Sequence, residues 1–465
     1  MAWAPLLDLG AQPAGALHER LTRAIRGAIR DGRLPRGAAL PPSRTLAEDL
    51  AVSRWAVTRA YSQLVTEGYL TSKTGSATRV LWSPNPDEER VPRSAAAPED
   101  SPPRYDLTTG APDYRAFPRR KWVDAIRTAA ETTPFNQLSY AAPGGVPRLR
   151  ALLADQLSRS RGADVGPDMV SVFTGATQSM AQVCRALSLA GFREIGMDNP
   201  GSPYLVRAAQ TAGLDVVPIR ADADGLVTDE LDSHPGLRVA LTGAAHQTLY
   251  GNPLAPDRRA ALLDWARRVD GLVIEDDWDA EFTLDGPVLP VMQGSDRRRV
   301  FLLGSMSRAL TPTVGVGWVI APPHWVEATQ AAREPVTGPP ALTQRALADF
   351  IESGGYGRHM RASRQRLRAR RDALLTALRG HLPEYPVSCP KASLHLLVRL
   401  RPDSDTGAVL AAAKRRDIDL CDPGYLYFAE PVNPESILQV GYTNLNDRDV
   451  AEAAATLARV IRECA

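Results

Sequence analysis

The chain has 465 residues, of which 44% are hydrophobic and 23% charged, a composition typical of folded globular domains that excludes wholesale disorder. This length exceeds one ordinary core, so two or three domains are expected. The net charge is only +2, yet residues 1–80 carry 11 Lys and Arg against 6 Asp and Glu, which points to nucleic acid for this part. Neither a zinc site nor a disulfide framework is indicated by the scattered cysteines, and no apolar run approaches the ~18 residues that span a bilayer. We therefore expect a soluble cytoplasmic protein.

The first predicted elements are three short helices. Apolar residues at helical spacing, with arginines on the opposite face, predict a helix over residues 17–29. A second helix is expected from Ser43, whose side chain would cap it, and a third from Arg54, capped by Ser53. Two such helices joined by a tight turn have helix-turn-helix geometry, and the two short strands around residues 73–76 predict a hairpin wing.

One segment of this region carries a family resemblance. LPPSRTLAEDLAVSRWAVTRAYSQLVTEGYL resembles the winged helix-turn-helix of the GntR family. The resemblance implies a DNA-binding domain over residues 1–82 that places its third helix in the major groove of double-stranded operator DNA. The predicted DNA-binding residues are Ser43, Arg44, Ser53, Arg54, Thr58, Arg59, Lys73 and Gly75.

The rest of the chain is predicted to be a linker and an α/β domain. Residues 83–104 are rich in Pro, Ala and charge without apolar periodicity, which predicts a semi-extended tether. From residue 105 short apolar runs alternate with amphipathic helices, the pattern of a mostly parallel sheet covered by helices. We expect a large domain over residues 105–356 and a small C-terminal α+β subdomain over residues 357–465.

The small subdomain is predicted to open with a long basic helix, HMRASRQRLRARRDALLTAL. Its many arginines allow two interpretations. They either form a solvated helix face or make a second nucleic-acid surface, and the solvated face is the default for such a charge run.

The order of short motifs in the large domain gives a second resemblance. DLTTGAPDYRAFPRRKW, SYAAPGGVPRLRALLADQL, FTGATQSM, DNPGSPY, HQTLYGNPL, VIEDDWDAEF, GSMSRALTP, PGYLYF and LQVGYTNL are similar to the motifs of fold-type I aminotransferases. Joined to the GntR module, the whole chain resembles the MocR family of transcriptional regulators. The resemblance implies a homodimer and a domain that binds pyridoxal phosphate (PLP) as an effector sensor.

Five positions depart from the PLP site that this resemblance implies. The Schiff-base lysine is matched by Arg308, whose delocalised, always protonated guanidinium cannot add to an aldehyde. The phosphate arginine is matched by Gly315, and the tyrosine that stacks on the ring by Ser202. Trp278 stands where a tyrosine would bond the phenolic oxygen, and Gln439 where an arginine would bind the substrate carboxylate.

Three further residues complete the predicted pocket. Asp276 matches the partner of the ring nitrogen, and Thr177 lies in a segment like the phosphate loop. His246 has either a structural role, bonding nearby backbone, or an acid-base role. We therefore expect a transcriptional regulator, not an enzyme, whose aminotransferase-like domain lacks PLP and acts as a dimerisation scaffold and sensor of another small, anionic ligand. The alternatives are a regulator that still binds PLP non-covalently, an active aminotransferase, and a constitutive DNA-binding protein.

Overall fold

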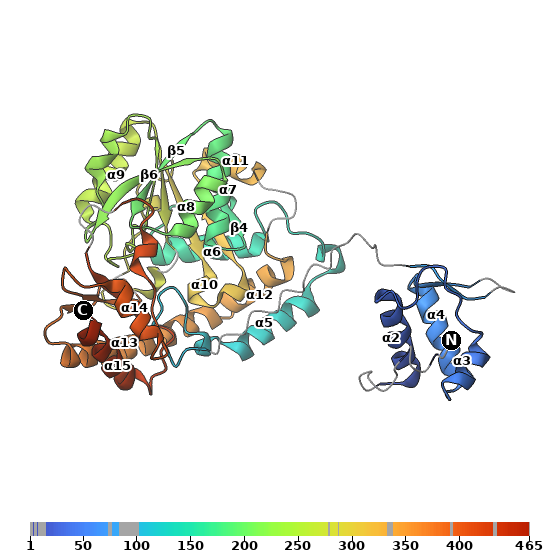
Figure 1. The fold of residues 1–465 in the computed structure, drawn as a ribbon. Coiled ribbons are helices and arrows are strands. Elements are labelled where there is room, and N and C mark those ends of the chain that lie inside the picture. Colours follow the sequence, from blue (N-terminus) through green and yellow to red (C-terminus); the bar gives the residue numbers. More distant parts are fainter. Residues whose placement is uncertain are drawn as a thin grey trace. The chain divides into compact units, whose positions relative to one another are not determined.

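The computed structural model describes residues 3, 7, 15–72, 77–82, 102–277, 280–286, 288–332, 338–390, 394–430 and 435–464. The chain divides into two compact units, Met1–Ser101 and Pro102–Ala465, each of which has its own core (Figure 1). Most of the predicted linker and the three predicted positions Lys73, Gly75 and Trp278 lie outside the described residues. Among the helices of the described ranges, none has the length and apolarity needed to cross a bilayer.

The smaller unit is a winged helix. Its elements are α2 (Leu17–Arg30), α3 (Ser43–Asp49), α4 (Arg54–Thr66), β1 (Leu70–Thr71) and β2 (Arg79–Val80). The two strands pair antiparallel, with Leu70 opposite Val80, which confirms the predicted hairpin. Leu21, Ile25 and Ile29 of α2 are buried among the apolar residues of α3 and α4, as their spacing of four predicts.

An eight-stranded sheet forms the centre of the larger unit. Its strand order is β4 (Val170–Phe173), β11 (Gly317–Ile320), β10 (Val300–Ser305), β9 (Leu272–Asp276), β8 (Val239–Thr242), β5 (Glu194–Asn199), β6 (Asp215–Asp222) and β7 (Gly225–Leu226). The strands from β10 to β6 are parallel, while β11 and β7 run antiparallel to their neighbours. This arrangement confirms the predicted α/β class.

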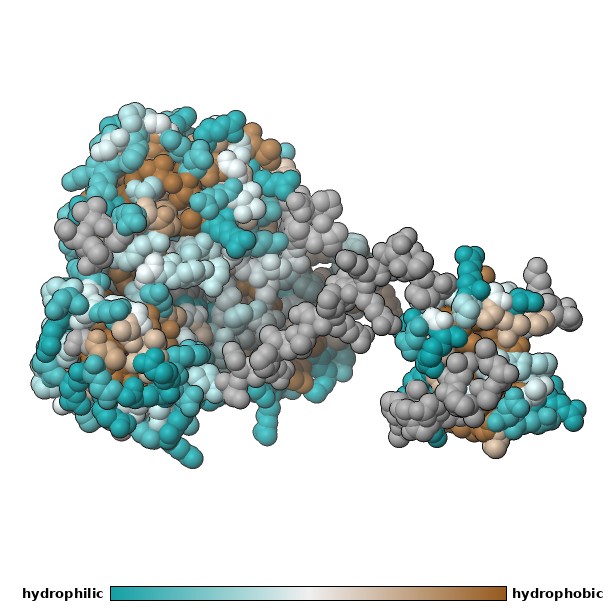
Figure 2. Space-filling model, viewed as in Figure 1, coloured by the Kyte–Doolittle hydropathy of each residue, from teal (hydrophilic) through white to brown (hydrophobic). Residues whose placement is uncertain are grey.

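Helices cover both faces of this sheet (Figure 1). Those of the large subdomain are α5 (Arg119–Thr132), α6 (Pro147–Arg161), α7 (Ala176–Leu189), α8 (Pro203–Thr211), α9 (Pro256–Arg268), α10 (Met306–Ala309), α11 (Val326–Ala331) and α12 (Ala341–Glu352). Successive strand residues alternate between two cores: Ile274 packs with α7 and α8, whereas Val273 packs with α9. In Figure 2 the visible face is mainly hydrophilic, and hydrophobic residues show between the polar ones.

The C-terminal part forms a second, smaller layer around an antiparallel sheet. Its elements are α13 (Gly355–His381), β12 (Val387–Ser388), β13 (His395–Arg399), α14 (Thr406–Lys414), β14 (Ile418–Asp419), β15 (Ile437–Gly441) and α15 (Val450–Cys464). The sheet has the order β12-β13-β15. Separately, β14 pairs in parallel with β3 (Tyr105–Asp106), so the first residues of the predicted large domain pack with this layer.

The arginines of α13 divide between solvent and the protein interior: Arg358, Arg361, Arg368 and Arg379 are exposed, as the solvated-face interpretation predicts, whereas Arg370 and Arg371 are buried. Arg371 forms an ion pair with Asp285, and Arg364 donates through Nε to the carbonyl of Glu281 at 2.6 Å. Arg370 is almost fully buried and meets Asp113 and Asp447. This helix therefore holds the two layers of the larger unit together through its guanidinium groups.

Candidate functional site

The predicted recognition helix, α4, has the expected cap and an exposed polar face. The Ser53 hydroxyl accepts a hydrogen bond from the backbone N–H of Ala56 at 3.2 Å, which confirms the predicted cap. Arg54, Thr58 and Arg59 are all exposed, and the Thr58 hydroxyl donates to the carbonyl of Arg54 at 3.0 Å. Their side chains therefore share the solvent face of α4, opposite the buried core face.

The predicted cap at Ser43 is wrong. Pro42 occupies the N-cap position, Ser43 is the first helical residue, and no side chain caps α3. Proline fixes its own φ and has an extended conformation here, so the helix begins without a hydroxyl acceptor. Arg44 remains exposed and makes only a loose pair with Glu48, with 3.4 Å between Nε and Oε1.

The sequence-predicted cofactor residues gather at one edge of the large sheet. Asp276 ends β9, Ser202 and His246 follow β5 and β8, and Arg308 follows β10. Thr177 lies in the first turn of α7, directly after β4. The carboxyl ends of the parallel strands meet at this edge, so these residues, distant in sequence, lie along the same edge of the sheet.

Arg308 is held inside the protein. It lies in the short helix α10 and is only 8% exposed. Its guanidinium reaches the segment that follows β3, because a methyl group built on Gly110 would lie 3.1 Å from Nη2 of Arg308. The backbone of Gly110 has φ +95°, a conformation that favours glycine, so this segment passes the guanidinium without a side chain between them.

The pocket beside Arg308 is small. It is lined by Asp113, Arg308, His359 and Arg366 among others, and its volume of about 10 Å³ is that of a single water site. The ring of His359 lies 2.8 Å from the carbonyl of Ala309 through Nε2, and burial lowers the pKa of this histidine.

Gln439 joins the two layers of the larger unit. Its side-chain amide donates to the carbonyls of Thr248 at 2.8 Å and Leu249 at 3.1 Å, and its Nε2 lies 3.2 Å from Nε2 of His395. Leu249 also belongs to an apolar cluster with Tyr250. The side-chain amide of Gln439, which was predicted to stand where an arginine would bind a substrate carboxylate, is therefore used in internal contacts.

The turn that contains Ser202 is also held by hydrogen bonds to other segments. Ser202 is partly buried and is the N-cap residue of α8 without a side-chain cap bond. Next to it, the backbone N–H of Gly201 donates to the carbonyl of Leu426 at 2.9 Å, and Gln247 donates to the carbonyl of Pro200 at 2.6 Å. The turn that contains Ser202, which was predicted to match the stacking tyrosine, is thus held against the small layer.

The remaining positions differ in exposure. Asp276 and His246 are buried, at the end of β9 and in the loop after β8, whereas Thr177 is exposed. Gly315, at the position of the phosphate arginine, has φ +60°, and a methyl group built there would meet no atom within 4 Å. This place is therefore open, and its left-handed backbone favours glycine.

Sequence reasoning missed two polar features close to the cleft. The first is Asp198 in β5, whose carboxylate accepts from the hydroxyl of Thr242 at 3.3 Å and the N–H of Gly243 at 3.4 Å. Burial raises the pKa of Asp198 to about 7. An isolated acidic residue in the motif DNPGSPY gives no signal of burial, so the sequence could not have singled it out.

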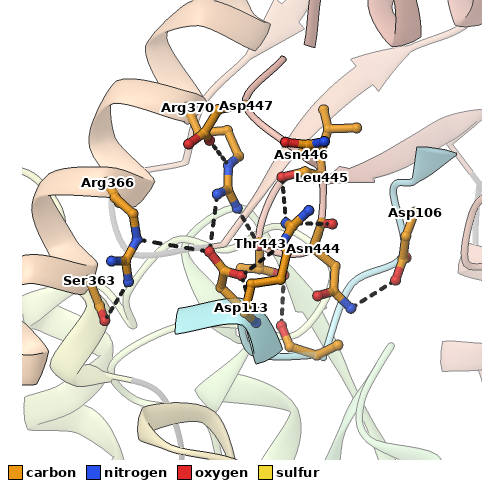
Figure 3. Close-up of polar contacts among 12 residues, drawn as sticks. Asp106, Asp113, Ser363, Arg366, Arg370, Thr443, Asn444, Leu445, Asn446 and Asp447 are labelled. Carbon is orange, nitrogen blue, oxygen red and sulfur yellow. Dashed lines mark hydrogen bonds and ion pairs between the residues drawn. The ribbon is translucent and has the colours of Figure 1, made fainter. Parts of the chain in front are cut away.

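The second is a network around Asp113, drawn in Figure 3. Its carboxylate accepts from Nη2 of Arg370 at 3.0 Å and from Nε of Arg115 at 3.2 Å. Arg370 also donates to Asp447 at 2.6 Å and to the carbonyl of Tyr442 at 3.1 Å. Burial raises the pKa of Asp113, but the neighbouring guanidinium groups outweigh this and hold the pKa below its ordinary value. The segment that touches Arg308 is thereby fixed to α13 and to the loop after β15.

Comparisons with known proteins place both units. The family described as "Bacterial regulatory proteins, gntR family" matches residues 17–80, and "Aminotransferase class I and II" matches residues 103–457. The pyridoxine biosynthesis transcriptional regulator PdxR of Corynebacterium glutamicum is 34% identical over 82% of this chain and 82% of its own. The probable rhizopine catabolism regulatory protein MocR of Rhizobium meliloti is 30% identical over 95% of this chain and 93% of its own.

Among solved structures, an archaeal alanine:glyoxylate aminotransferase superposes with a TM-score of 0.71 at 21% identity, covering 77% of this chain and 91% of that one. At that identity the likeness concerns the fold alone. The regulator relatives, in contrast, span both units, the winged helix and the aminotransferase-like sheet. The chain therefore belongs to the MocR-type transcriptional regulators, in which a GntR winged helix is joined to a fold-type I aminotransferase-like domain.

Proposed function

We propose that this DNA-binding transcriptional regulator works without PLP, and that its aminotransferase-like unit is a dimerisation scaffold and a sensor of a different, anionic small molecule. One observation carries the proposal: the short helix α10, which follows β10, carries the buried Arg308 and no lysine. A guanidinium keeps its proton and its delocalised charge under all physiological conditions, so it forms no covalent bond with an aldehyde.

The other side chains of the cleft do not fit PLP either. Gly315 offers no charge to a phosphate, and Ser202 offers no ring to stack on a pyridine. Gln439 already donates to two backbone carbonyls. Binding a substrate carboxylate there would require breaking these buried hydrogen bonds, and a neutral amide would replace them with a weaker partner than arginine.

The rival in which PLP is the effector deserves a direct test, because one relative is named as a regulator of pyridoxine biosynthesis. Purified wild-type protein and Arg308→Lys would be mixed with PLP, reduced with borohydride and weighed by intact-mass spectrometry. Exposed lysines such as Lys121 and Lys414 can also add to the aldehyde, so each adduct is located by peptide mapping. We expect no adduct on the wild-type peptide that contains Arg308, and equilibrium dialysis should show no saturable retention of PLP. A saturable PLP complex of the wild type would contradict the proposal, and the lysine variant reports whether the rest of the cleft still admits the cofactor.

The proposed effector would be anionic, since the buried Arg308 supplies a permanent positive charge to the pocket that it lines. Such a ligand regulates only if it binds the DNA-competent and incompetent arrangements with different affinity. A panel of small carboxylates and phosphates would be screened by melting temperature on the wild type and on Arg308→Gln. We expect at least one anion to raise the melting temperature of the wild type alone. If no anion raises the melting temperature and none changes the affinity for operator DNA, the unit is a scaffold and not a sensor.

Dimerisation is supported by an apolar surface on the larger unit. Val123 and Ile126 of α5 are exposed, and the following turn presents Phe135 at 94% exposure, Leu138, and Tyr140 at 80%. Exposed large apolar side chains concentrated within eighteen residues are typical of a protein interface. Light scattering should give a dimer for the wild type and a monomer for Phe135→Asp, whereas Leu189→Asp, at another exposed leucine, should remain a dimer. A monomeric wild type would contradict this part.

For the DNA unit, Arg54→Ala should weaken operator binding without unfolding the chain, because Arg54 is exposed in the first turn of α4. The operator would be obtained by selection from random duplexes, and affinity measured by gel shift at stated salt, since phosphate contacts make affinity salt-dependent. Arg267→Ala, at an exposed arginine of α9, is the matched control. If the wild type, Arg54→Ala and Arg267→Ala bind the operator with equal affinity, Arg54 does not contribute to the DNA interface.

A further inference from the structure

One tryptophan of α4, the predicted recognition helix, has a side chain that is mostly exposed to solvent. Trp55 is the second residue of α4 and is 63% exposed, the largest exposed fraction of any tryptophan in the described residues. Neighbouring Ala56 and Val57 are fully buried, so the indole lies off the core face. An apolar surface of this size gains free energy when it is removed from water, so a complex that covers the indole would be stabilised.

The indole is held in place rather than trailing in solvent. The ring of His18, from the first turn of α2, meets it edge to face, with centroids 5.4 Å apart and an interplanar angle of 73°. Such aromatic pairs prefer this geometry and lower the rotational freedom of the ring. The indole is therefore presented in a fixed direction before any partner arrives, which reduces the entropic cost of using it in a contact.

Its surroundings select the kind of partner. Trp55, Thr58, Arg59 and Ser62 are exposed at spacings of three and four, so they share one face of α4. Arg54 adds a second positive charge beside the indole. Among the described residues of this face no acidic side chain lies between the two arginines, which suits a polyanion better than a protein surface.

We propose that Trp55 reads a thymine, packing its indole against the C5-methyl group in the major groove of the operator. This inference rests on the DNA-binding function and adds a specificity-determining residue to it. In a helix-turn-helix, the first residues of the recognition helix reach base edges. The methyl group is the one apolar feature that a base pair shows in the major groove, and apolar side chains are what recognise it. The flanking arginines hold the backbone and leave the indole over the bases.

The test pairs a change in the protein with the matching change in the DNA. An operator is selected from random duplexes with the full-length wild type, and each thymine is replaced in turn by uracil, which lacks only the methyl group. We expect one replacement to weaken wild-type binding about tenfold, within the range of a single mismatched pair. Trp55→Ala should bind the thymine duplex more weakly than the wild type by a similar factor. Its affinity should not change when that thymine is replaced by uracil. Val65→Ala, at an exposed apolar residue further along α4, should bind as the wild type does.

The outcomes separate the inference from the function it rests on. If the wild type selects an operator but Trp55→Ala has the same affinity and the same response to every uracil, the proposed contact is wrong. It is also wrong if Trp55→Ala weakens binding on thymine and uracil duplexes alike, because the indole then contacts something other than the methyl. A change in oligomeric mass with unchanged DNA affinity would assign Trp55 to a protein contact and overturn the proposal. If the wild type selects no sequence, operator binding itself fails.

Discussion

Removing the Arg370 side chain should destabilise the larger unit more than almost any other single substitution of a charged residue. Its guanidinium is 3% exposed and donates to two carboxylates and to the backbone of the loop after β15. Arg370→Ala would leave the Asp113 carboxylate, which is 7% exposed, without its main counter-charge. Breaking a buried ion pair by removing one partner costs about 3–5 kcal/mol, because the other charge stays buried.

The partners of Arg370 supply a graded control. Asp447 is 63% exposed, so Asp447→Asn removes a contact that water can replace and should cost at most about 1 kcal/mol. Asp113→Asn leaves Arg370 buried beside a neutral amide and should fall between the two. The order of loss should therefore be Arg370→Ala, then Asp113→Asn, then Asp447→Asn.

Calorimetry of the full chain would measure this order. With an unfolding entropy of roughly 2.1 cal/mol/K per residue, a loss of 3–5 kcal/mol lowers the melting temperature of a unit of this size by about 4–7 °C. The transition of the winged helix should not move, since Arg370 belongs to the other compact unit. Equal shifts for Arg370→Ala and Asp447→Asn would refute the reasoning, because burial would then not set the cost.

Three further predictions test other parts of the fold. Burial raises the pKa of Asp198 to about 7, so as the pH rises towards 7 the unfolded chain releases this proton while the folded chain keeps it, and stability falls. Relative to the wild type, Asp198→Asn should therefore gain about 3 kcal/mol between pH 5 and pH 8, and an equal difference at both pH values would contradict this. Ser53→Ala removes the cap of α4 and should lower the stability of the smaller unit by about 1 kcal/mol in thermal unfolding, while Ser43→Ala should be nearly neutral. Gly441→Ala should unfold or loosen the small layer, seen as faster amide exchange in β15, since the added methyl would meet the carbonyl of Thr108.

Local patterns determined most of the architecture. The helices of the winged unit appear at the predicted places, and the larger unit has the predicted, mostly parallel sheet, because apolar periodicity reports burial within a single element. The prediction that Arg308 stands in place of a Schiff-base lysine comes from the sequence, because it depends on residue type alone. The missed cap at Ser43 shows the limit of such rules at helix ends, where proline one residue earlier takes the position.

Only the tertiary structure decided what the polar side chains do. The arginines of α13 look solvated in sequence, yet Arg370 is buried against Asp113, 257 residues away in the chain. The side-chain amide of Gln439 donates to the carbonyl of Leu249, 190 residues away in the chain. The guanidinium of Arg308 lies next to Gly110. Even β3 pairs with β14 rather than with the sheet that follows it. Periodicity reports which face of an element is covered, whereas the partner of a charge depends on which distant segments the fold brings together, and that information is absent from any local stretch of sequence.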